Sequence, residues 1–343
     1  MKSSLGSPYL SIVATSRNDD HGGGMLRRMR MFVRGLDQQA KRHGLHAELV
    51  LVEWNPPLDR PHLHEVLPPP APGSPLVIRY ITVPNEVHRR WRHWETIPLF
   101  QMIAKNAGIR RAQGEFVLST NVDLLFSDSL CAFLARQELD PRKMYRANRC
   151  DVPQGIPEDS LVADQLSYCE QNIIRRCGHV QEKTVYAWKN GMKRGLKRIL
   201  GRPLSPLSPV DTDACGDFTL LAKKAWQEIR GYPELGMFSI YVDGLAVHAA
   251  ASLGYETLNL PADHCTFHAE HHSGWMSMSI TEKIRLMQER PFLDYATYGE
   301  AVRWIWEHHQ PLPINDDNWG CGQDQLAEVL INGQTPASKQ TNA

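Results

Sequence analysis

Histidines gather near one end of this chain, and an aspartate lies far upstream at the end of an apolar segment. The histidines are His264, His268, His271 and His272. The aspartate is Asp123, in the run Asn121-Val122-Asp123. Carboxylate oxygens bind divalent cations, and imidazole nitrogen suits Mn²⁺. Asp123 can therefore supply one metal ligand, and His268 or His271 could complete the shell. The alternatives are an ordinary strand-to-turn transition and a surface loop rich in histidine.

Polar side chains also follow two other apolar segments. The run from Arg17 to Asp20 comes after the first segment, and Glu53 to Asn55 ends the second. In sheets of parallel strands, ligands bind outside the carboxyl ends of the strands. We therefore expect these residues and Asn121–Asp123 to meet at one edge of a sheet.

The elements that must position these residues alternate in type. Apolar, β-branched runs predict strands, and amphipathic runs predict helices. We predict strands over 9–16, 47–54, 76–83 and 115–126, with helices over 25–43 and 95–112. This order predicts an α/β fold with a mostly parallel sheet that carries helices on both faces.

The second half of the chain is less regular. We predict helices over about 161–177, 241–255 and 280–309, and a strand followed by a helix over 215–234. A histidine-rich loop is expected over 263–275. Residues 151–211 are expected to form an insertion within a single domain of residues 1–330, and 331–343 a polar tail.

Composition excludes several classes of protein. The 343 residues contain 38 basic and 38 acidic side chains, so no net charge draws the protein to nucleic acid. Seven scattered cysteines form no C-x-x-C pair, which argues against a disulfide framework or thiolate zinc site. The chain shows no signal peptide and no membrane-spanning run, so we expect a cytoplasmic protein.

Short motifs in the middle of the chain resemble those of family-2-like glycosyltransferases of the GT-A type. The run N-A-G-I at 106–109, then A-x-G-E at 112–115, precedes Asn121-Val122-Asp123. The segment G-D-F-T at 216–219, followed by G-Y-P-E at 231–234, resembles the acceptor side of these enzymes. The similarity spans about residues 9–275, with 150–212 unmatched.

The resemblance implies a Rossmann-like GT-A fold and transfer of a sugar from a UDP-sugar or other nucleotide-sugar to a glycan or lipid-linked hydroxyl, with inversion. Asn121-Val122-Asp123 would be the D-x-D motif with asparagine in the first place. Asp123, His268 and His271 would then hold Mn²⁺ or Mg²⁺ against the diphosphate. The nucleotide-binding part would be residues 9–126, and the acceptor and catalytic part 212–309.

The resemblance also assigns roles in nucleotide binding. These fall on Arg17, Asn18, Asp19, Glu53 and Asn121. A salt bridge between Arg17 and Glu53 is the alternative for that pair.

An inverting transfer needs a carboxylate base near the acceptor hydroxyl. Asp243 matches the family's position for this base, although aspartate is also favoured at helix caps. Asp217 is the second candidate for the base, with a plain turn residue as its alternative.

Residues 187–200 place lysine and arginine on one side and apolar side chains largely opposite. Such a helix could rest on anionic lipid at the inner face of the membrane and bring the enzyme to a lipid-linked acceptor. The alternative is an amphipathic helix that packs on its own domain.

Two other functions fit part of the pattern. A sugar-phosphate nucleotidyltransferase uses a related sheet, but it needs a basic glycine-rich loop after the first strand, which Arg17–Gly24 does not supply. A non-catalytic nucleotide or carbohydrate binder would account for the missing first aspartate.

Overall fold

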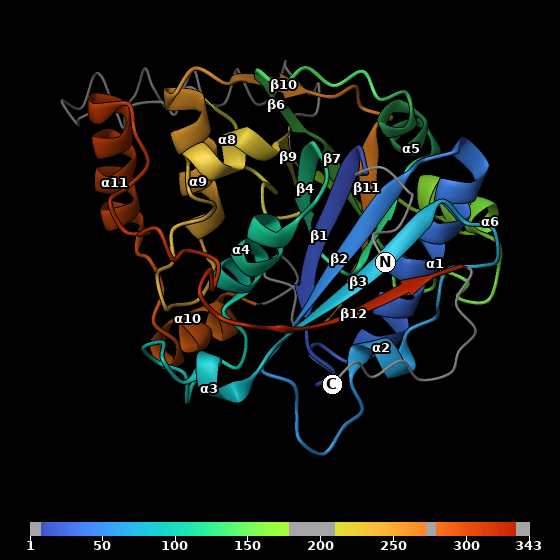
Figure 1. The fold of residues 1–343 in the computed structure, drawn as a ribbon, viewed down its shortest axis with the longest axis horizontal. Helices are drawn as coiled ribbons and strands as arrows, with labels where there is room; N and C mark the ends of the chain where they lie inside the picture. The colour runs from blue at the N-terminus through green and yellow to red at the C-terminus, as the bar shows by residue number, and fades with distance from the viewer. Residues whose placement is uncertain (1–7, 178–209, 272–278, 334–343) are drawn as a thin grey trace.

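The computed structural model describes residues 8–177, 210–271 and 279–333. A large central sheet runs through it, with helices on both faces (Figure 1). The strands of this sheet are β1 (Leu10–Ser16), β2 (Ala47–Trp54), β3 (Leu76–Val83), β4 (Phe116–Thr120), β6 (Lys143–Arg146), β9 (Phe218–Ala222), β10 (Glu256–Asn259) and β12 (Ala327–Asn332).

The order across the central sheet is β10-β6-β9-β4-β1-β2-β3-β12. Strands β4, β1, β2 and β3 are parallel, whereas β12 is antiparallel to β3 and β9 is antiparallel to both β4 and β6. Strand β10 is parallel to β6. The mixed α/β fold with a mostly parallel sheet is thereby confirmed.

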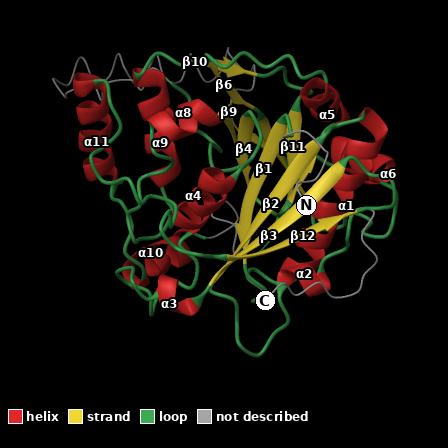
Figure 2. Ribbon diagram, in the orientation of Figure 1, coloured by secondary structure: helices red, strands yellow, loops and turns green. Residues whose placement is uncertain are grey.

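Buried apolar side chains line both faces of this sheet, because helices cover each face and exclude water from it. Helices α1 (Met25–His43) and α5 (Asp128–Ala135) cover one face, and α4 (Gln101–Arg111), α8 (Lys223–Glu228) and α9 (Val242–Ser252) cover the other (Figure 2). Gly108 allows α4 to lie against β1, since a Cβ there would stand 2.5 Å from Val13 Cγ1.

A smaller second sheet borders the central one. Its order is β5 (Leu124–Phe126), β11 (Cys265–Ala269), β7 (Asn148–Val152) and β8 (Arg175–Cys177). Strand β11 is parallel to β7, and both outer pairings are antiparallel. Helix α6 (Val162–Gln171) connects β7 to β8, and its buried side chains share a core with this sheet.

The remaining helices are short or lie toward the end of the chain. They are α2 (Leu63–Val66), α3 (Asn85–His88), α10 (Ile280–Glu289) and α11 (Tyr295–His308). Helix α11 packs on α9. None of the helices in the described ranges is long and apolar enough to cross a membrane.

Most predicted elements appear within a few residues, and six differ. The helix predicted over 280–309 divides into α10 and α11. The strand predicted over 115–126 divides into β4 and β5 around the polar turn 121–123, and the helix predicted over 95–112 begins only at Gln101. The helix predicted over 161–177 ends at Gln171, because the chain then forms β8. The histidine-rich loop contains β11, and β12 reaches into the predicted tail. Residues 187–200 lie outside the described ranges, so the membrane-contact helix stays a prediction.

Candidate metal and active site

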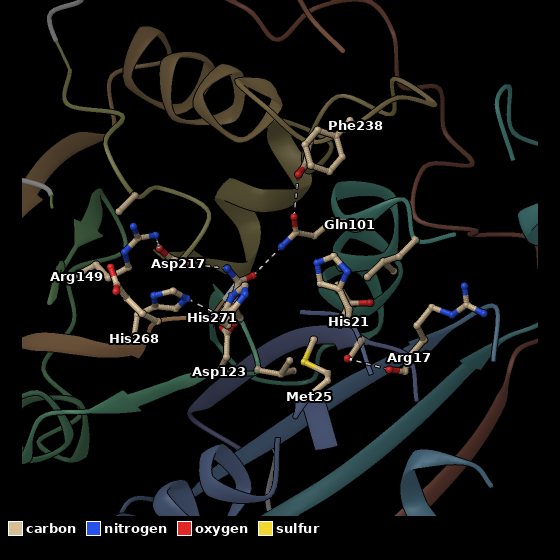
Figure 3. A pocket seen from close by; sticks show the side chains of 18 of the residues that line it. Arg17, His21, Met25, Gln101, Asp123, Arg149, Asp217, Phe238, His268 and His271 are labelled. Atoms are coloured by element: carbon tan, nitrogen blue, oxygen red, sulfur yellow. Dashed lines mark hydrogen bonds and ion pairs between the residues drawn. The ribbon is translucent and has the colours of Figure 1, made fainter. Parts of the chain in front are cut away.

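Three buried side chains from distant parts of the chain converge at the junction of the two sheets. Asp123 lies in the turn between β4 and β5, His268 lies on β11, and His271 follows that strand. Asp123 Oδ2 is 3.6 Å from His268 Nε2 and 3.4 Å from His271 Nε2. One potential ligand atom from each residue lies within 4.8 Å of the others (Figure 3). This group is called the metal group below.

Strand register explains why these residues meet. Strand β11 pairs antiparallel with β5, and His268 is the register partner of Leu124. Leu124 directly follows Asp123, so the pairing brings His268 next to the carboxylate. His271 lies three residues further on, and its own imidazole also reaches Asp123 Oδ2.

The ionisation of Asp123 is coupled to that of the two histidines. Burial alone would raise the pKa of Asp123, but hydrogen bonding and charge from His268 and His271 outweigh it and hold that pKa well below its usual range. Burial would lower the pKa of His268, yet Asp123 and Asp151 raise it to about 9. Asp123 is therefore an anion at neutral pH, as a metal ligand must be, whereas His268 must release a proton when it binds a metal.

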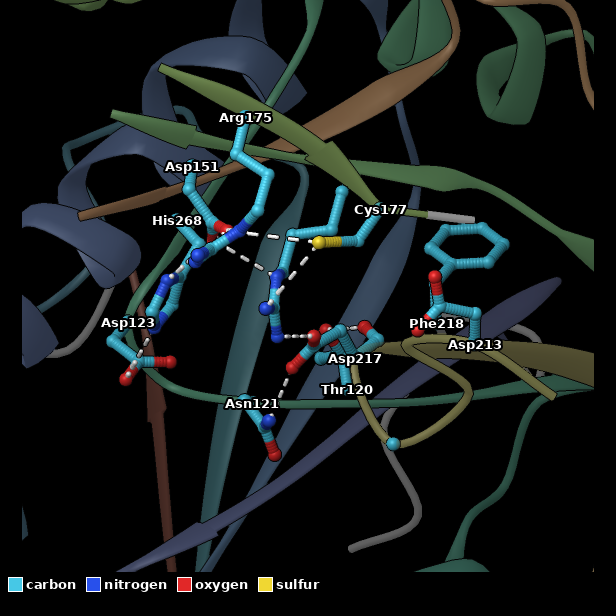
Figure 4. Close-up of polar contacts among 12 residues, drawn as sticks. Thr120, Asn121, Asp123, Asp151, Arg175, Cys177, Asp213, Asp217, Phe218 and His268 are labelled. Carbon is cyan, nitrogen blue, oxygen red and sulfur yellow. Dashed lines mark hydrogen bonds and ion pairs between the residues drawn. The ribbon is translucent and has the colours of Figure 1, made fainter. Parts of the chain in front are cut away.

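A second carboxylate stands behind His268. Asp151 on β7 is the register partner of His268, and Asp151 Oδ1 lies 3.0 Å from His268 Nδ1. Arg175 on β8 is the register partner of Asp151 from the other side, and its Nε donates to Asp151 Oδ2 at 2.6 Å. Arg149 Nε lies 3.0 Å from Asp151 Oδ1. Figure 4 shows Asp151 beside His268 and Arg175. A carboxylate behind a histidine is typical of metal sites, because it fixes the tautomer and the ring orientation.

Polar contacts continue from Arg149 across the floor of the site. Arg149 donates to Asp217 Oδ2 at 2.7 Å, and Asn121 Nδ2 donates to Asp217 Oδ1 at 2.5 Å. Gln101 Nε2 in turn donates to Asn121 Oδ1 at 2.9 Å, and Ser239 Oγ donates to Gln101 Oε1 at 2.9 Å. This chain of contacts fixes the side chains on both sides of the space above Asp123.

That space is a cavity of about 410 Å³. Its lining includes the metal group, Asp217, Asn121, and Arg17 with Asp19 from the turn after β1. The cavity thus lies at the carboxyl ends of β1 and β4, where ligands of parallel sheets bind.

The structure divides the predicted nucleotide residues into two groups. Arg17, Asp19 and Asn121 line the cavity. Asn18 and Glu53 do not line it: Asn18 Nδ2 donates to the Pro61 carbonyl at 3.0 Å, and Glu53 is buried within the fold.

The alternative salt bridge between Arg17 and Glu53 is not present. Arg17 Nε lies 3.4 Å from Asp19 Oδ2. Glu53 Oε2 lies 2.6 Å from His62 Nδ1, and Glu53 Oε1 accepts from the Leu63 N–H at 2.9 Å. Glu53 therefore anchors the start of α2.

The two candidate bases occupy different places. Asp217 lines the cavity, whereas Asp243 does not. Asp243 lies in the first turn of α9, directly behind Gly216, where an added Cβ would meet Asp243 Oδ2 at 2.8 Å. Burial raises the pKa of Asp243, although contacts with Cys215 and Lys105 oppose the shift. Tyr241 rather than Asp243 is the N-cap of α9.

No protein-family model matches the chain, and no curated protein matches it in sequence. Among solved structures, it is similar to the catalytic domain of Drosophila β1,4-galactosyltransferase 7 in complex with xylobiose. The identity is 9%, the similarity covers 76% of this chain and 71% of that chain, and the TM-score is 0.32. At these values no function follows from the likeness, so the functional argument rests on the site.

The donor set of the metal group fits a divalent cation. It offers two imidazole nitrogens and one carboxylate, all buried and converging. Mg²⁺ prefers oxygen ligands, whereas imidazole suits Mn²⁺ and other transition metals. Of the two cations predicted from the sequence, Mn²⁺ matches this donor set better.

Several residues of the site did not stand out in the sequence. These are Asp151, Arg149, Arg175, Gln101, Phe238 and Arg290. Arg149 and Asp151 alternate along β7, and residues at i and i+2 of a strand share a face. That alternation was the available local signal, but only the pairing of β7 with β11 shows what the two residues contact.

Proposed function

We propose that this protein is a metal-dependent glycosyltransferase that moves a sugar from a nucleotide-sugar to a hydroxyl group of a glycan or lipid-linked acceptor. The observation that carries the proposal is the metal group, Asp123, His268 and His271, at the floor of a cavity bounded by the ends of β1 and β4. The motifs around Asn106, Asn121 and Gly216 resemble GT-A enzymes and support the same assignment.

The donor would lie across the ends of β1 and β4. Its diphosphate would approach the metal group, and a divalent cation there would act as the Lewis acid for the departing diphosphate. Arg17 and Asp19, which line the cavity, would lie on the nucleotide side. Asn121 would contact the ribose or supply a neutral carbonyl ligand. Asn18 and Glu53 would support this wall from behind rather than contact the nucleotide.

The acceptor hydroxyl would lose its proton to a carboxylate as the new bond forms. Asp217 is the candidate that faces the cavity, and Asn121 and Arg149 hold its two oxygens in place. Asp243 is the alternative that the family resemblance indicates, with a pKa raised by burial as a base requires. We propose Asp217 first because a base must reach the proton that it removes.

UDP is the nucleotide, and inversion the stereochemistry, that the resemblance implies, and both belong to the proposal. A cytoplasmic location and a membrane contact through 187–200 do as well. The test is release of UDP from a panel of UDP-sugars in the presence of Mn²⁺ and simple glycoside acceptors. UDP release that needs acceptor and stops with chelator supports the proposal, and full activity in chelator would contradict it.

A non-catalytic binder of nucleotide or sugar is the second candidate. Two observations favour it: Asn121 replaces the first aspartate of the D-x-D motif, and Asp243 does not line the cavity. Tight UDP binding without UDP release across the same panel would indicate this function. Pyrophosphate release from sugar phosphates and nucleoside triphosphates would instead indicate a nucleotidyltransferase.

A further inference from the structure

One wall of the cavity is built by two segments that lie far apart in the sequence. Phe238 precedes α9, and Arg290 follows α10, and both line the cavity. The Phe238 N–H donates to the Pro291 carbonyl at 2.8 Å, and Phe238 forms a parallel bridge with Phe292. These backbone contacts hold the two segments side by side.

The Arg290 guanidinium is held by an aromatic ring instead of an acid. Its Cζ lies 5.5 Å from the centroid of the Phe238 ring. Among the residues in the described ranges, no carboxylate lies within salt-bridge distance of Arg290. The ring holds the planar cation in one orientation without neutralising it.

The other arginines that line the cavity are neutralised. Arg17 pairs with Asp19, Arg149 with Asp151 and Asp217, and Arg175 with Asp151 and Glu270. Arg290 therefore differs from them in having a positive charge available to a ligand. Guanidinium groups bind carboxylate and phosphate oxygens through two parallel hydrogen bonds, which gives such a site its specificity.

Arg290, His21 and the metal group line the same cavity. The ring of His21 is 6.5 Å from that of His271. A substrate bound at the metal group would therefore lie in the same cavity as Arg290.

We infer that Arg290, held over Phe238, binds an oxyanion of the substrate, either a phosphate of the nucleotide-sugar or an acidic group on the acceptor sugar. The naming of these two sources rests on the proposed function, whereas the anion site rests on the wall itself. If the acceptor sugar were neutral and the donor phosphates contacted only the metal group, Arg290 would have no ligand.

The test compares three variants with the wild-type protein. Arg290→Gln removes the charge, and Arg290→Lys keeps the charge but loses the planar fork. Arg285→Gln is the matched control, because Arg285 lies in α10, the helix that ends just before Arg290, is exposed, and pairs with Glu289 within that helix. Two probes are used: UDP with Mn²⁺ by calorimetry, and D-glucuronate against D-glucose in chelator by ligand-observed NMR.

Arg290→Gln should lower the affinity for one of the two probes by about tenfold or more, as expected for a lost charge-assisted hydrogen bond. Arg290→Lys should lower that affinity less. Arg285→Gln should change neither. Weaker UDP binding assigns the anion to the donor, and loss of the preference for glucuronate over glucose assigns it to the acceptor. If both probes bind Arg290→Gln within twofold of wild type, the anion site is wrong.

The two proposals fail separately. If wild-type protein binds no UDP with Mn²⁺ but binds glucuronate through Arg290, the anion site stands and the proposed donor falls. If UDP binds and requires Asp123 while Arg290→Gln has no effect on either probe, the proposed function stands and the anion site falls. Phe238→Leu provides a second variant, because loss of the ring should reproduce part of the Arg290→Gln effect.

Discussion

His268 and Asp151 are register partners on adjacent parallel strands, and His268 Nδ1 lies 3.0 Å from Asp151 Oδ1. The other ring nitrogen of His268 faces Asp123 at 3.6 Å. One imidazole thus connects a buried structural carboxylate to a carboxylate that faces the cavity. We therefore propose that Asp151 is a positioning residue for the metal group.

Asp151→Asn should weaken Mn²⁺ binding by about 10- to 100-fold, the usual cost of losing a partner behind a metal-binding histidine. The amide can still contact His268, but it no longer enforces one tautomer. Titration calorimetry measures the affinity, and a melting curve shows whether the variant folds.

Asp263→Asn is the control for this variant, because Asp263 is an exposed aspartate that also contacts a histidine, His264, at 3.1 Å. Asp263 lies just before β11. Asp263→Asn should leave Mn²⁺ affinity unchanged. Equal Mn²⁺ affinity in wild type and a folded Asp151→Asn variant would contradict the positioning role.

Asp217→Asn should lower kcat by about 10²- to 10⁴-fold while UDP–Mn²⁺ affinity changes little, since a general base contributes to the chemical step. Asp243→Asn should have a smaller effect on kcat if Asp217 is the base. Steady-state rates and UDP calorimetry on both variants separate the two candidates. A large loss of kcat in Asp243→Asn alone would transfer the role to Asp243.

Asn106→Ala should destabilise the fold by about 2 kcal/mol or more, because it leaves the buried Tyr232 N–H without its partner. Asn106 accepts from the Tyr232 N–H and donates to the Tyr232 carbonyl, both at 2.8 Å. Gly231, just before Tyr232, has a φ of +72° and leaves no room for a Cβ beside Asn106. Chemical denaturation measures the loss.

Gln171→Ala is the control for the Asn106 variant, because the Gln171 side chain forms only an exposed contact with Ser167. Its free energy of unfolding should stay within about 0.5 kcal/mol of wild type. An Asn106→Ala variant as stable as this control would show that the contacts with Tyr232 contribute nothing.

His248 should make the protein less stable in mild acid. Burial lowers its pKa from 6.5 to about 4. The Trp306 indole N–H donates to His248 Nδ1 at 3.1 Å. Protonation of Nδ1 would therefore place two N–H donors against each other. The unfolded state takes up the proton first, so this contribution is present above pH 6.5 and is lost as the pH falls toward 4.

Between neutral pH and pH 5, protonation linked to His248 should lower the free energy of unfolding by about 2 kcal/mol. His248→Gln should remove this part of the pH dependence, even though it changes stability at pH 7. Denaturation at pH 7 and pH 5 on both proteins measures the difference. A wild-type protein and variant that lose equal stability between these pH values would refute the assignment to His248.

Local patterns were sufficient for much of the fold. Helix α1 has the predicted bounds, 25–43, and β2 and β3 have theirs, because burial on one face or two imposes a period on neighbouring residues. The residue types of Asp123, His268 and His271 were enough to predict them as candidate metal ligands, and the structure brings the three side chains together. Strands as short as β8 and β11 leave too few residues for a period to show.

Long-range pairing explains what the sequence could not indicate. Asp151 and His268 are separated by 117 residues, and only the register of β7 with β11 brings them together. Glu53 shows the converse: it ends a strand as expected, but its side chain turns to His62 and Leu63 instead of the cavity. Which face a strand residue occupies depends on partners that no local pattern contains.

The most direct measurement is the binding of UDP to wild-type protein and to Asp123→Ala, each with Mn²⁺ and with chelator, by titration calorimetry. The account predicts that wild type binds UDP at least about tenfold more tightly with Mn²⁺ than in chelator, and that Asp123→Ala loses this gain. A folded Asp123→Ala variant that keeps the full Mn²⁺-dependent gain would contradict the metal group as the centre of the site.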